Sequence, residues 1–420
     1  MARYRVILAG ALLCLSACTG FHRGEISSVR PEAVGLSSDG LREVDEALQG
    51  FVERGEVAGA VTVIARRGKI AYAKTFGKKD IASGERMTLD TIFRIYSMTK
   101  PITSVAVMML YEEGKLDLDD AVSQYLPELG GVKVYESGTA ENPTLVRSTR
   151  VMTIRDLLRH TSGLATGGDG PVGRLYNEAK VREGSLSLLV KRLAKVPLLD
   201  QPGTRWVYGP STDVLGRIVE VVSEKSLDVF FEERIFAPLD MHDSGFSVPE
   251  EKLHRFATNY GPKPGGGIRV VDDPATSKYR STPLLFSGGG GMVSTARDYL
   301  RFCQMILNGG TLNGRRILKP ETVAEMTKNQ VPESAMPIGL GQEKRTGVGF
   351  GLGFYVRVAR GDTDPASRVG EIGWGGWAST HFWLLPKKEL VVIALEQHVP
   401  FRDRIRRKIK GLIYDALLSE

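Results

Sequence analysis

The chain has 420 residues, of which 42% are apolar and 25% charged, a composition typical of a globular protein with one large domain or two of average size. Its 56 Lys and Arg residues and 49 Asp and Glu residues leave a formal charge of +7. The two signs are interleaved, and the basic residues form no stripe with aromatic residues between them. These features exclude a largely disordered chain and give no indication of nucleic-acid binding.

The first twenty residues, MARYRVILAGALLCLSACTG, combine two arginines with an apolar stretch (6–15) and small residues before a cysteine. This pattern predicts a secretory signal and is too short for a membrane span. The residues just before Cys18 resemble a bacterial lipobox, which implies a lipoprotein-type signal (1–18) and a lipid on Cys18. The alternative is ordinary cleavage with an incidental cysteine. The expected location is the periplasmic side of the cell envelope, and the absence of aspartate after Cys18 favours the outer membrane.

Residues 19–35 are expected to be a linker, and residues 36–420 a single domain. The first element of this domain is predicted to be a helix that is capped by Ser38 or Asp39 and ends near Gly55. The apolar residues of this segment recur at the helical period of 3.6, at Leu41, Val44, Leu48 and Phe51.

Strand patterns stand at both ends of the domain. The alternating runs AVTVIA and IAYAKTFG, with RRGK between them, predict a hairpin over residues 60–77. Near the C-terminus, GFGLGFYVR, THFWLLP and ELVVIALEQ each predict one strand, and a terminal helix follows. Because neither end holds a complete sheet, we expect one antiparallel sheet built from both. The basic residues of RDRIRRKIK are expected to form the solvated face of the terminal helix.

The pattern changes between residues 116 and 285, where short helical pieces alternate with loops rich in Gly and Pro. We expect a mostly helical lobe (116–285) inserted into an α/β part made of residues 36–115 and 286–420. The predicted fold class is therefore α+β, an antiparallel sheet flanked by helices with an inserted lobe. The seam between the lobe and the sheet predicts a cleft, since ligand sites favour such boundaries.

The stretch FRIYSMTKPITS (93–104) places Ser97 and Lys100 one helical turn apart if a helix begins at Ser97. Pro101 then falls near the first turn, where a helix tolerates it. A serine hydroxyl becomes a good nucleophile when a base takes its proton, and a neutral lysine can be that base. The helix N-terminus adds partial positive charge that favours an oxyanion. Ser-x-x-Lys alone is a weak signal, because ordinary helix starts also carry a capping serine and a surface lysine.

Three further stretches follow in a characteristic order: TIRDLLRHTSGL (153–164), WVYGPSTDVLGRIVE (206–220) and GGGGMVSTARDYLRF (288–302). Together with SMTK they resemble the serine β-lactamase-like hydrolases, specifically the class C β-lactamase relatives called family VIII carboxylesterases. The resemblance covers residues 30–415. It implies the β-lactamase/transpeptidase-like fold and an acyl-enzyme formed on Ser97 with Lys100 as the proton partner.

The resemblance also implies roles for other residues. Tyr208 matches the tyrosine of the second family motif, which relays a proton between serine and leaving group. The stretch GWGGWAST stands where the third motif, Lys-Thr-Gly or His-Thr-Gly, lines the cleft, and so implies substrate binding by Trp374, Gly375 and Gly376. The backbone N–H groups of Ser97 and Trp377 would then form the oxyanion hole.

Two departures from the family pattern bear on the substrate. Pro210 replaces the asparagine of class C β-lactamases, which removes an amide that would contact a lactam side chain or the catalytic lysine. Trp374 replaces a lysine, which removes a cation that would hold a substrate carboxylate. A neutral ester is therefore expected to bind better than a penicillin-type ligand.

Other candidates receive no catalytic role. His160 is interpreted as support at a helix end, and His381 and His398 as core or cleft rim. Cys303 lies on an apolar helical stripe and has no disulfide partner once the signal is removed. No metal or other cofactor is expected, because the histidines are not closely spaced and no cysteine pair remains. The sequence contains neither a Gly-x-Ser-x-Gly elbow nor a phosphate-binding loop.

The preferred function is hydrolysis of small acyl esters by a protein held at the membrane through a lipid on Cys18. One alternative on the same fold and residues is a β-lactamase or D-amino-acid peptidase. Another, of a different class, is a non-catalytic envelope protein that binds peptidoglycan or peptides. The expected partners are a small-molecule ester or amide and the membrane, without nucleic acid.

Overall fold

The computed structural model describes residues 26–340, 343–362 and 364–418. The predicted signal, Cys18 and the first part of the predicted linker lie outside these residues. Within the described residues, no helix combines the length and the apolar character that a membrane span requires.

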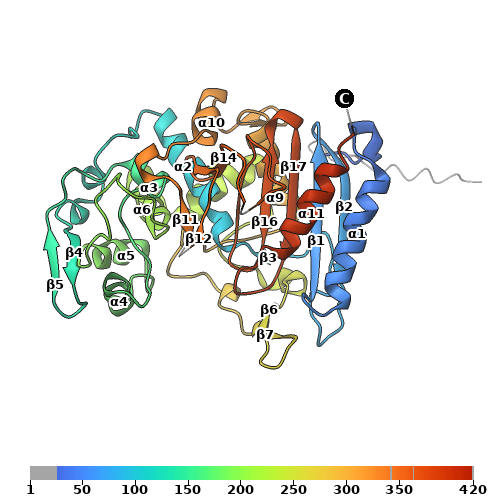
Figure 1. The fold of residues 1–420 in the computed structure, drawn as a ribbon, viewed down its shortest axis with the longest axis horizontal. Coiled ribbons are helices and arrows are strands. Elements are labelled where there is room, and N and C mark those ends of the chain that lie inside the picture. The colour runs from blue at the N-terminus through green and yellow to red at the C-terminus, as the bar shows by residue number, and fades with distance from the viewer. Residues whose placement is uncertain (1–25, 341–342, 363, 419–420) are drawn as a thin grey trace, which may run out of the picture.

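A seven-stranded antiparallel sheet joins the two ends of the domain, as predicted (Figure 1). The hairpin of β1 (Gly59–Arg66) and β2 (Lys69–Gly77) forms one edge. β1 pairs with the last strand, β17 (Leu390–Glu396), so that Ala60 lies opposite Glu396. Toward the other edge follow β16 (His381–Leu385), β15 (Ile372–Gly375), β14 (Tyr355–Arg357) and β13 (Val348–Phe350).

The segment GFGLGFYVR forms two strands, so the prediction of a single strand was wrong. β13 and β14 pair with each other, with Phe350 opposite Tyr355. The chain reverses between them because Gly353 adopts a φ of +96° and a Cβ on Gly351 would lie 2.1 Å from the carbonyl oxygen of Met326. Two strands of three residues each produce the same short apolar run as one longer strand.

Helices cover both faces of the sheet. α1 (Ser38–Glu53) and α11 (Arg404–Asp415) lie side by side over one face (Figure 1). α2 (Thr99–Glu112) and α9 (Ala296–Leu307) pack on the other, with Cys303 wholly buried. Alternate strand residues divide between the two cores, as Val391 and Val392 do.

The start of α1 differs from the prediction by one residue. The N-cap is Ser37, whose side-chain oxygen accepts a hydrogen bond from the Gly40 N–H. The extended backbone of Ser37 places its hydroxyl over the first turn, which is the geometry of a capping residue.

The segment between α2 and α9 holds short helices, most of them in the part of Figure 1 that lies away from α1. These are α3 (Ile154–Leu158), α4 (Pro171–Glu178), α5 (Leu186–Leu193), α6 (Ser211–Ser223), α7 (Leu227–Phe231) and α8 (Ala237–Leu239). Two hairpins interrupt them, β4–β5 (Val134–Gly138, Pro143–Val146) and β6–β7 (Asn259–Pro262, Ile268–Asp272). α6 packs against α2, which brings the start of α6 toward Ser97.

Short strand pairs and one more α-helix complete the α-helices and strands of the described residues. The pairs are β3–β8 (Phe93–Arg94, Val293–Ser294), β9–β10 (Thr311–Leu312, Arg315–Arg316) and β11–β12 (Gly339–Leu340, Glu343–Lys344), and the helix is α10 (Pro320–Thr327). The β3–β8 pair matters for the site, because it joins the segment before Ser97 to the segment after the glycine run.

The basic residues of α11 are only in part solvated, which corrects the prediction. Lys408 is exposed, whereas Lys410 is wholly buried and donates to Glu371 (2.5 Å) and Asp364 (2.8 Å). Arg406 pairs with the same Asp364 (2.5 Å). Asp364 and Glu371 belong to the loop before β15. Their position beneath α11 depends on tertiary contacts, which the helical pattern of residues 404–415 does not reveal.

Candidate active site

The turn that carries Ser97 is held by its neighbours. β3 leads into a 3-10 turn, Tyr96–Met98, and α2 begins at Thr99 rather than at Ser97. Tyr96 has a φ of +41°, which is uncommon for a bulky residue. The Thr99 hydroxyl donates to the Tyr96 carbonyl (2.7 Å) and accepts from the Met292 N–H (3.2 Å). These bonds secure the backbone that presents Ser97 at the start of α2.

The structure brings Ser97, Lys100 and Tyr208 together. Ser97 Oγ lies 3.3 Å from Lys100 Nζ and 2.8 Å from the Tyr208 hydroxyl. Lys100 is 3% exposed, and its Nζ also donates to the Gly289 carbonyl (2.5 Å). The same Nζ lies 4.6 Å from the centre of the Tyr208 ring. The nucleophile candidate thus contacts a buried amine and a phenol at once.

Asp213, which the sequence motifs did not single out, holds the glycine run opposite Lys100. It is buried in the first turn of α6, and its Oδ1 accepts from the Ser287 hydroxyl (2.5 Å) and the Gly289 N–H (2.9 Å). A Cβ on Gly289 would lie 2.7 Å from Asp213 Oδ2, so this close approach requires glycine. In the sequence Asp213 is an ordinary acidic residue of a first helical turn. Only its tertiary partners show that it supports the carbonyl that Lys100 contacts.

The end of β15 lies against the Ser97 turn because Gly376 has no side chain. A Cβ on Gly376 would lie 2.3 Å from the Ile95 carbonyl oxygen. The Gly376 N–H donates to the Thr380 carbonyl (2.7 Å), closing the turn that contains Trp377. In the part of the chain that the structure describes, the N–H groups of Ser97 and Trp377 have no hydrogen-bond acceptor. They are therefore available as donors to a substrate oxygen.

Trp374 belongs to a cluster of aromatic rings beside Tyr208. It is 6% exposed, and its ring centre lies 5.5 Å from that of Tyr208 and 5.2 Å from that of Phe350. The His160 ring also packs against Tyr208, with the two ring centres 4.9 Å apart. Burial lowers the pKa of His160 well below its ordinary value, so the ring is neutral. The cluster holds the phenol of Tyr208 in place.

A cleft of about 470 Å³ opens at Ser97, within the usual size of ligand sites. Aromatic and apolar side chains dominate its walls, among them Tyr355, Trp374, Trp377, Pro400 and Phe401. Gly375 and Gly376 also line it, so the segment that the third motif indicates borders the same space as Ser97.

The cleft also contains two arginines, so the absence of lysine at position 374 does not leave it without cations. Each arginine is compensated by a carboxylate. Arg345 Nη2 lies 3.2 Å from Glu343, and Arg406 Nη1 lies 2.5 Å from Asp364. Compensated guanidinium groups attract a substrate carboxylate less than a free ammonium group does.

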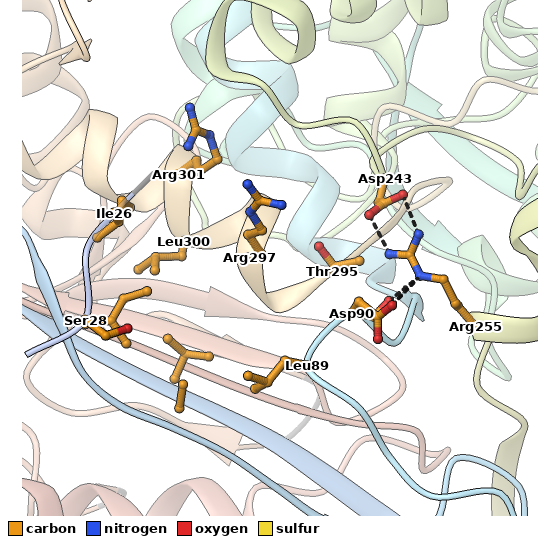
Figure 2. A pocket seen from close by; sticks show the side chains of 13 residues that line it. Ile26, Ser28, Leu89, Asp90, Asp243, Arg255, Thr295, Arg297, Leu300 and Arg301 are labelled. Atoms are coloured by element: carbon orange, nitrogen blue, oxygen red, sulfur yellow. Dashed lines mark hydrogen bonds and ion pairs between the residues drawn. The ribbon is translucent and has the colours of Figure 1, made fainter. Parts of the chain in front are cut away.

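A second cavity, of about 480 Å³, lies between β1, β2 and α9 (Figure 2). Figure 2 shows Arg255 between two carboxylates, with Asp243 contacting two of its nitrogens and Asp90 a third (3.1 Å). Neither Ser97 nor Tyr208 lines this cavity. Among the described residues, no three His, Cys, Asp or Glu side chains gather as a metal site requires. We therefore place the candidate active site in the Ser97 cleft.

This fold, with a serine and a lysine one turn apart at a cleft beside the sheet, defines the β-lactamase/transpeptidase-like class. The chain belongs to the beta-lactamase family, because the family model described as Beta-lactamase matches residues 44–414.

The relatives whose names state an activity include esterases and acyltransferases. The chain is 36% identical over 366 residues to Protein Rv1367c of Mycobacterium tuberculosis. The aligned region covers 86% of this chain and 89% of that protein. It is 31% identical over 389 residues to Esterase EstB of Burkholderia gladioli, covering 86% and 91%. The solved structure of "EstCE1, a hydrolase with promiscuous acyltransferase activity" matches with a TM-score of 0.75 and 27% identity, covering 89% of this chain and 98% of that one.

Proposed function

We propose that this protein is a serine hydrolase that cleaves small acyl esters through an acyl-enzyme on Ser97. Ser97 Oγ attacks the ester carbonyl while its proton passes to Lys100. The N–H groups of Ser97 and Trp377 stabilise the tetrahedral oxyanion. The carbon–oxygen bond to the alcohol then breaks, and the alkoxide leaves with a proton relayed through Tyr208. Water attacks the acyl-enzyme by the same route and releases the acid.

One observation carries this proposal: the Ser97 hydroxyl lies within hydrogen-bond reach of both Lys100 (3.3 Å) and Tyr208 (2.8 Å). Burying an amine costs free energy. A non-catalytic protein would gain nothing from a lysine buried against a serine, whereas a hydrolase needs this arrangement to activate the serine. This favours an enzyme over a non-catalytic binding protein.

The preference for neutral esters rests on the replacement of lysine by Trp374 and on the pairing of Arg345 and Arg406 with carboxylates. The similarity to Esterase EstB supports the same preference. Steady-state rates with p-nitrophenyl butyrate and with a chromogenic cephalosporin compare the two substrate classes directly. If the cephalosporin were hydrolysed faster than the ester, the β-lactamase alternative would be favoured over the esterase.

We further infer that the protein is a lipoprotein on the periplasmic side of the cell envelope. The support is the apolar run that ends in small residues before Cys18. The mass of the N-terminal peptide after extraction from membranes tests this inference, and an unmodified Cys18 would refute it.

The acyl-enzyme is tested by the intact mass of the protein after exposure to a fluorophosphonate. Wild-type protein should gain one adduct, located by peptide mapping at Ser97, because a phosphonyl group on an activated serine is stable. Ser97→Ala should gain none and still fold, since among the described residues the Ser97 hydroxyl bonds only Lys100 and Tyr208 and each such bond contributes about 1 kcal/mol. If the folded wild-type protein gained no adduct, the non-catalytic binding protein would become the favoured alternative.

Asp213→Ala is expected to lower kcat for p-nitrophenyl butyrate by about 10- to 100-fold with little change in KM, because small displacements near the reacting groups have effects of this size. The variant removes the acceptor that holds Ser287 and Gly289 and so loosens the carbonyl that Lys100 contacts. Asp213→Asn is the matched control, since its amide oxygen can accept the same two bonds. An equal loss in both variants would show that charge rather than position is what Asp213 supplies.

A further inference from the structure

His381 lies at the candidate active site, although the sequence suggested no role for it. It begins β16 and pairs opposite Gly375 of β15. Its side chain is only 2% exposed and yet lines the same cleft as Ser97. A buried polar ring at the wall of a mainly apolar cleft needs partners for its nitrogens, either from the protein or from a ligand.

The hydrogen bond made by Nε2 defines what the other nitrogen can do. His381 Nε2 lies 3.2 Å from the carbonyl oxygen of Arg402. A carbonyl oxygen only accepts, so Nε2 carries the proton and Nδ1 keeps its lone pair. Burial, together with the nearby Arg406 cation, lowers the pKa of His381 to about 3. The ring is therefore neutral near pH 7, and Nδ1 is a hydrogen-bond acceptor.

Nδ1 faces the space that a side chain at position 375 would occupy. A Cβ on Gly375 would lie 2.9 Å from Nδ1 and 3.3 Å from Cε1 of His381. Because Gly375 itself lines the cleft, its missing side chain leaves this edge of the imidazole at the cleft wall. In the described ranges of the chain, no donor is found for Nδ1. The ring packs at 5.2 Å against Phe401, another residue of the wall.

We propose that His381 Nδ1 accepts a hydrogen bond from a hydroxyl group carried by the substrate, so that the preferred substrates are hydroxylated esters. This inference rests on the proposed esterase function and specifies its substrate class. The hydroxyl can stand on the acid or on the alcohol, since both offer the same donor. A substrate without it leaves an acceptor unpaired in a mostly apolar wall, and such a site discriminates against the analogue that lacks the hydroxyl.

The test compares kcat/KM of the full chain within two pairs of esters that differ in one hydroxyl. The first pair is p-nitrophenyl 3-hydroxybutyrate and p-nitrophenyl butyrate, which probes the acid. The second is 2-hydroxypropyl butyrate and propyl butyrate, which probes the alcohol. In the wild-type protein the hydroxylated member of one pair should be favoured by about 3- to 10-fold, the effect of one net hydrogen bond.

Two variants separate recognition from packing. His381→Phe keeps a ring against Phe401 and removes the acceptor, so the ratio of kcat/KM within the favoured pair should fall to about one, whatever change is common to both members. His381→Gln retains an acceptor and should keep part of the preference. Phe401→Leu is the matched control, because it trims the same wall without removing an acceptor. It should slow both members of a pair alike and leave their ratio unchanged.

Equal kcat/KM within both pairs in the wild-type protein would overturn the proposal, and this result does not depend on whether any variant folds. An equal loss of both members in His381→Phe would also overturn it and would point to packing or to a bound water. If the wild-type protein turned over none of the four esters, this result would refute the proposed esterase function. It would also refute the recognition of hydroxylated esters, which rests on that function.

Discussion

Lys100→Met is expected to lower kcat for p-nitrophenyl butyrate by about 10³- to 10⁴-fold, the upper range for loss of a positioned general base. Methionine fills similar space but cannot take the Ser97 proton, and it leaves the Gly289 carbonyl without its donor. The loss should appear in the acylation step, measured as the rate of p-nitrophenol release under single-turnover conditions.

The double variant Ser97→Ala/Lys100→Met tests whether the two residues act as a unit. It should be no slower than Ser97→Ala alone, because a base has no function without the nucleophile that it activates. If the rate losses of the two single variants multiplied in the double variant, Lys100 would act in a step that does not involve Ser97. A Lys100→Met variant with wild-type rates would assign the proton to Tyr208, whose hydroxyl lies 2.8 Å from Ser97 Oγ.

Lys410→Met is expected to lower the free energy of unfolding by about 3–5 kcal/mol, the cost of removing one partner from a buried ion pair. Lys410 is wholly buried and donates to Glu371 and Asp364. Tyr355 (2.6 Å) and Tyr414 (2.5 Å) donate to the same Glu371. The variant leaves these carboxylates with fewer donors beneath α11. Urea unfolding of the wild-type and variant proteins at pH 7 measures the difference.

Lys408→Met is the matched control, because Lys408 lies on the same helix and is exposed. The free energy of unfolding of this variant should differ little from that of the wild-type protein. Adding Glu371→Gln to Lys410→Met should recover part of the loss, since it removes the unpaired buried charge. If the two single lysine variants were equally stable, the buried network would contribute nothing measurable.

The effect of Lys410→Met should also depend on pH. Burial alone would raise the pKa of Glu371, but Lys410 and the hydrogen bonds from Tyr355 and Tyr414 hold it below the ordinary value. A carboxyl group with a lowered pKa in the folded state stabilises the fold above its unfolded pKa of about 4.3 and loses that contribution as the pH falls. The difference between the two proteins should therefore be largest near pH 7 and shrink below about pH 4.

Local patterns were sufficient to predict most of the architecture. The hairpin of β1 and β2 and the helices α1 and α11 follow from periodicities that persist over eight or more residues. The prediction of one strand over GFGLGFYVR was wrong because its elements are too short to show a repeated alternation. β13 and β14 have three residues each, and the reversal between them depends on Gly351 meeting the Met326 carbonyl.

Ser97 and Lys100 are three positions apart, so a helical turn at this point of the chain brings their side chains to one face; the structure forms it as a 3-10 turn that continues into α2. The contacts that complete the site join distant positions. Asp213 meets Gly289 across 76 residues, and Tyr208 meets Ser97 across 111. The tautomer of His381 depends on a carbonyl 21 residues away. Spacing along the chain predicts neighbours within a helix or strand, whereas contacts between elements arise only when the sheet and the lobe pack.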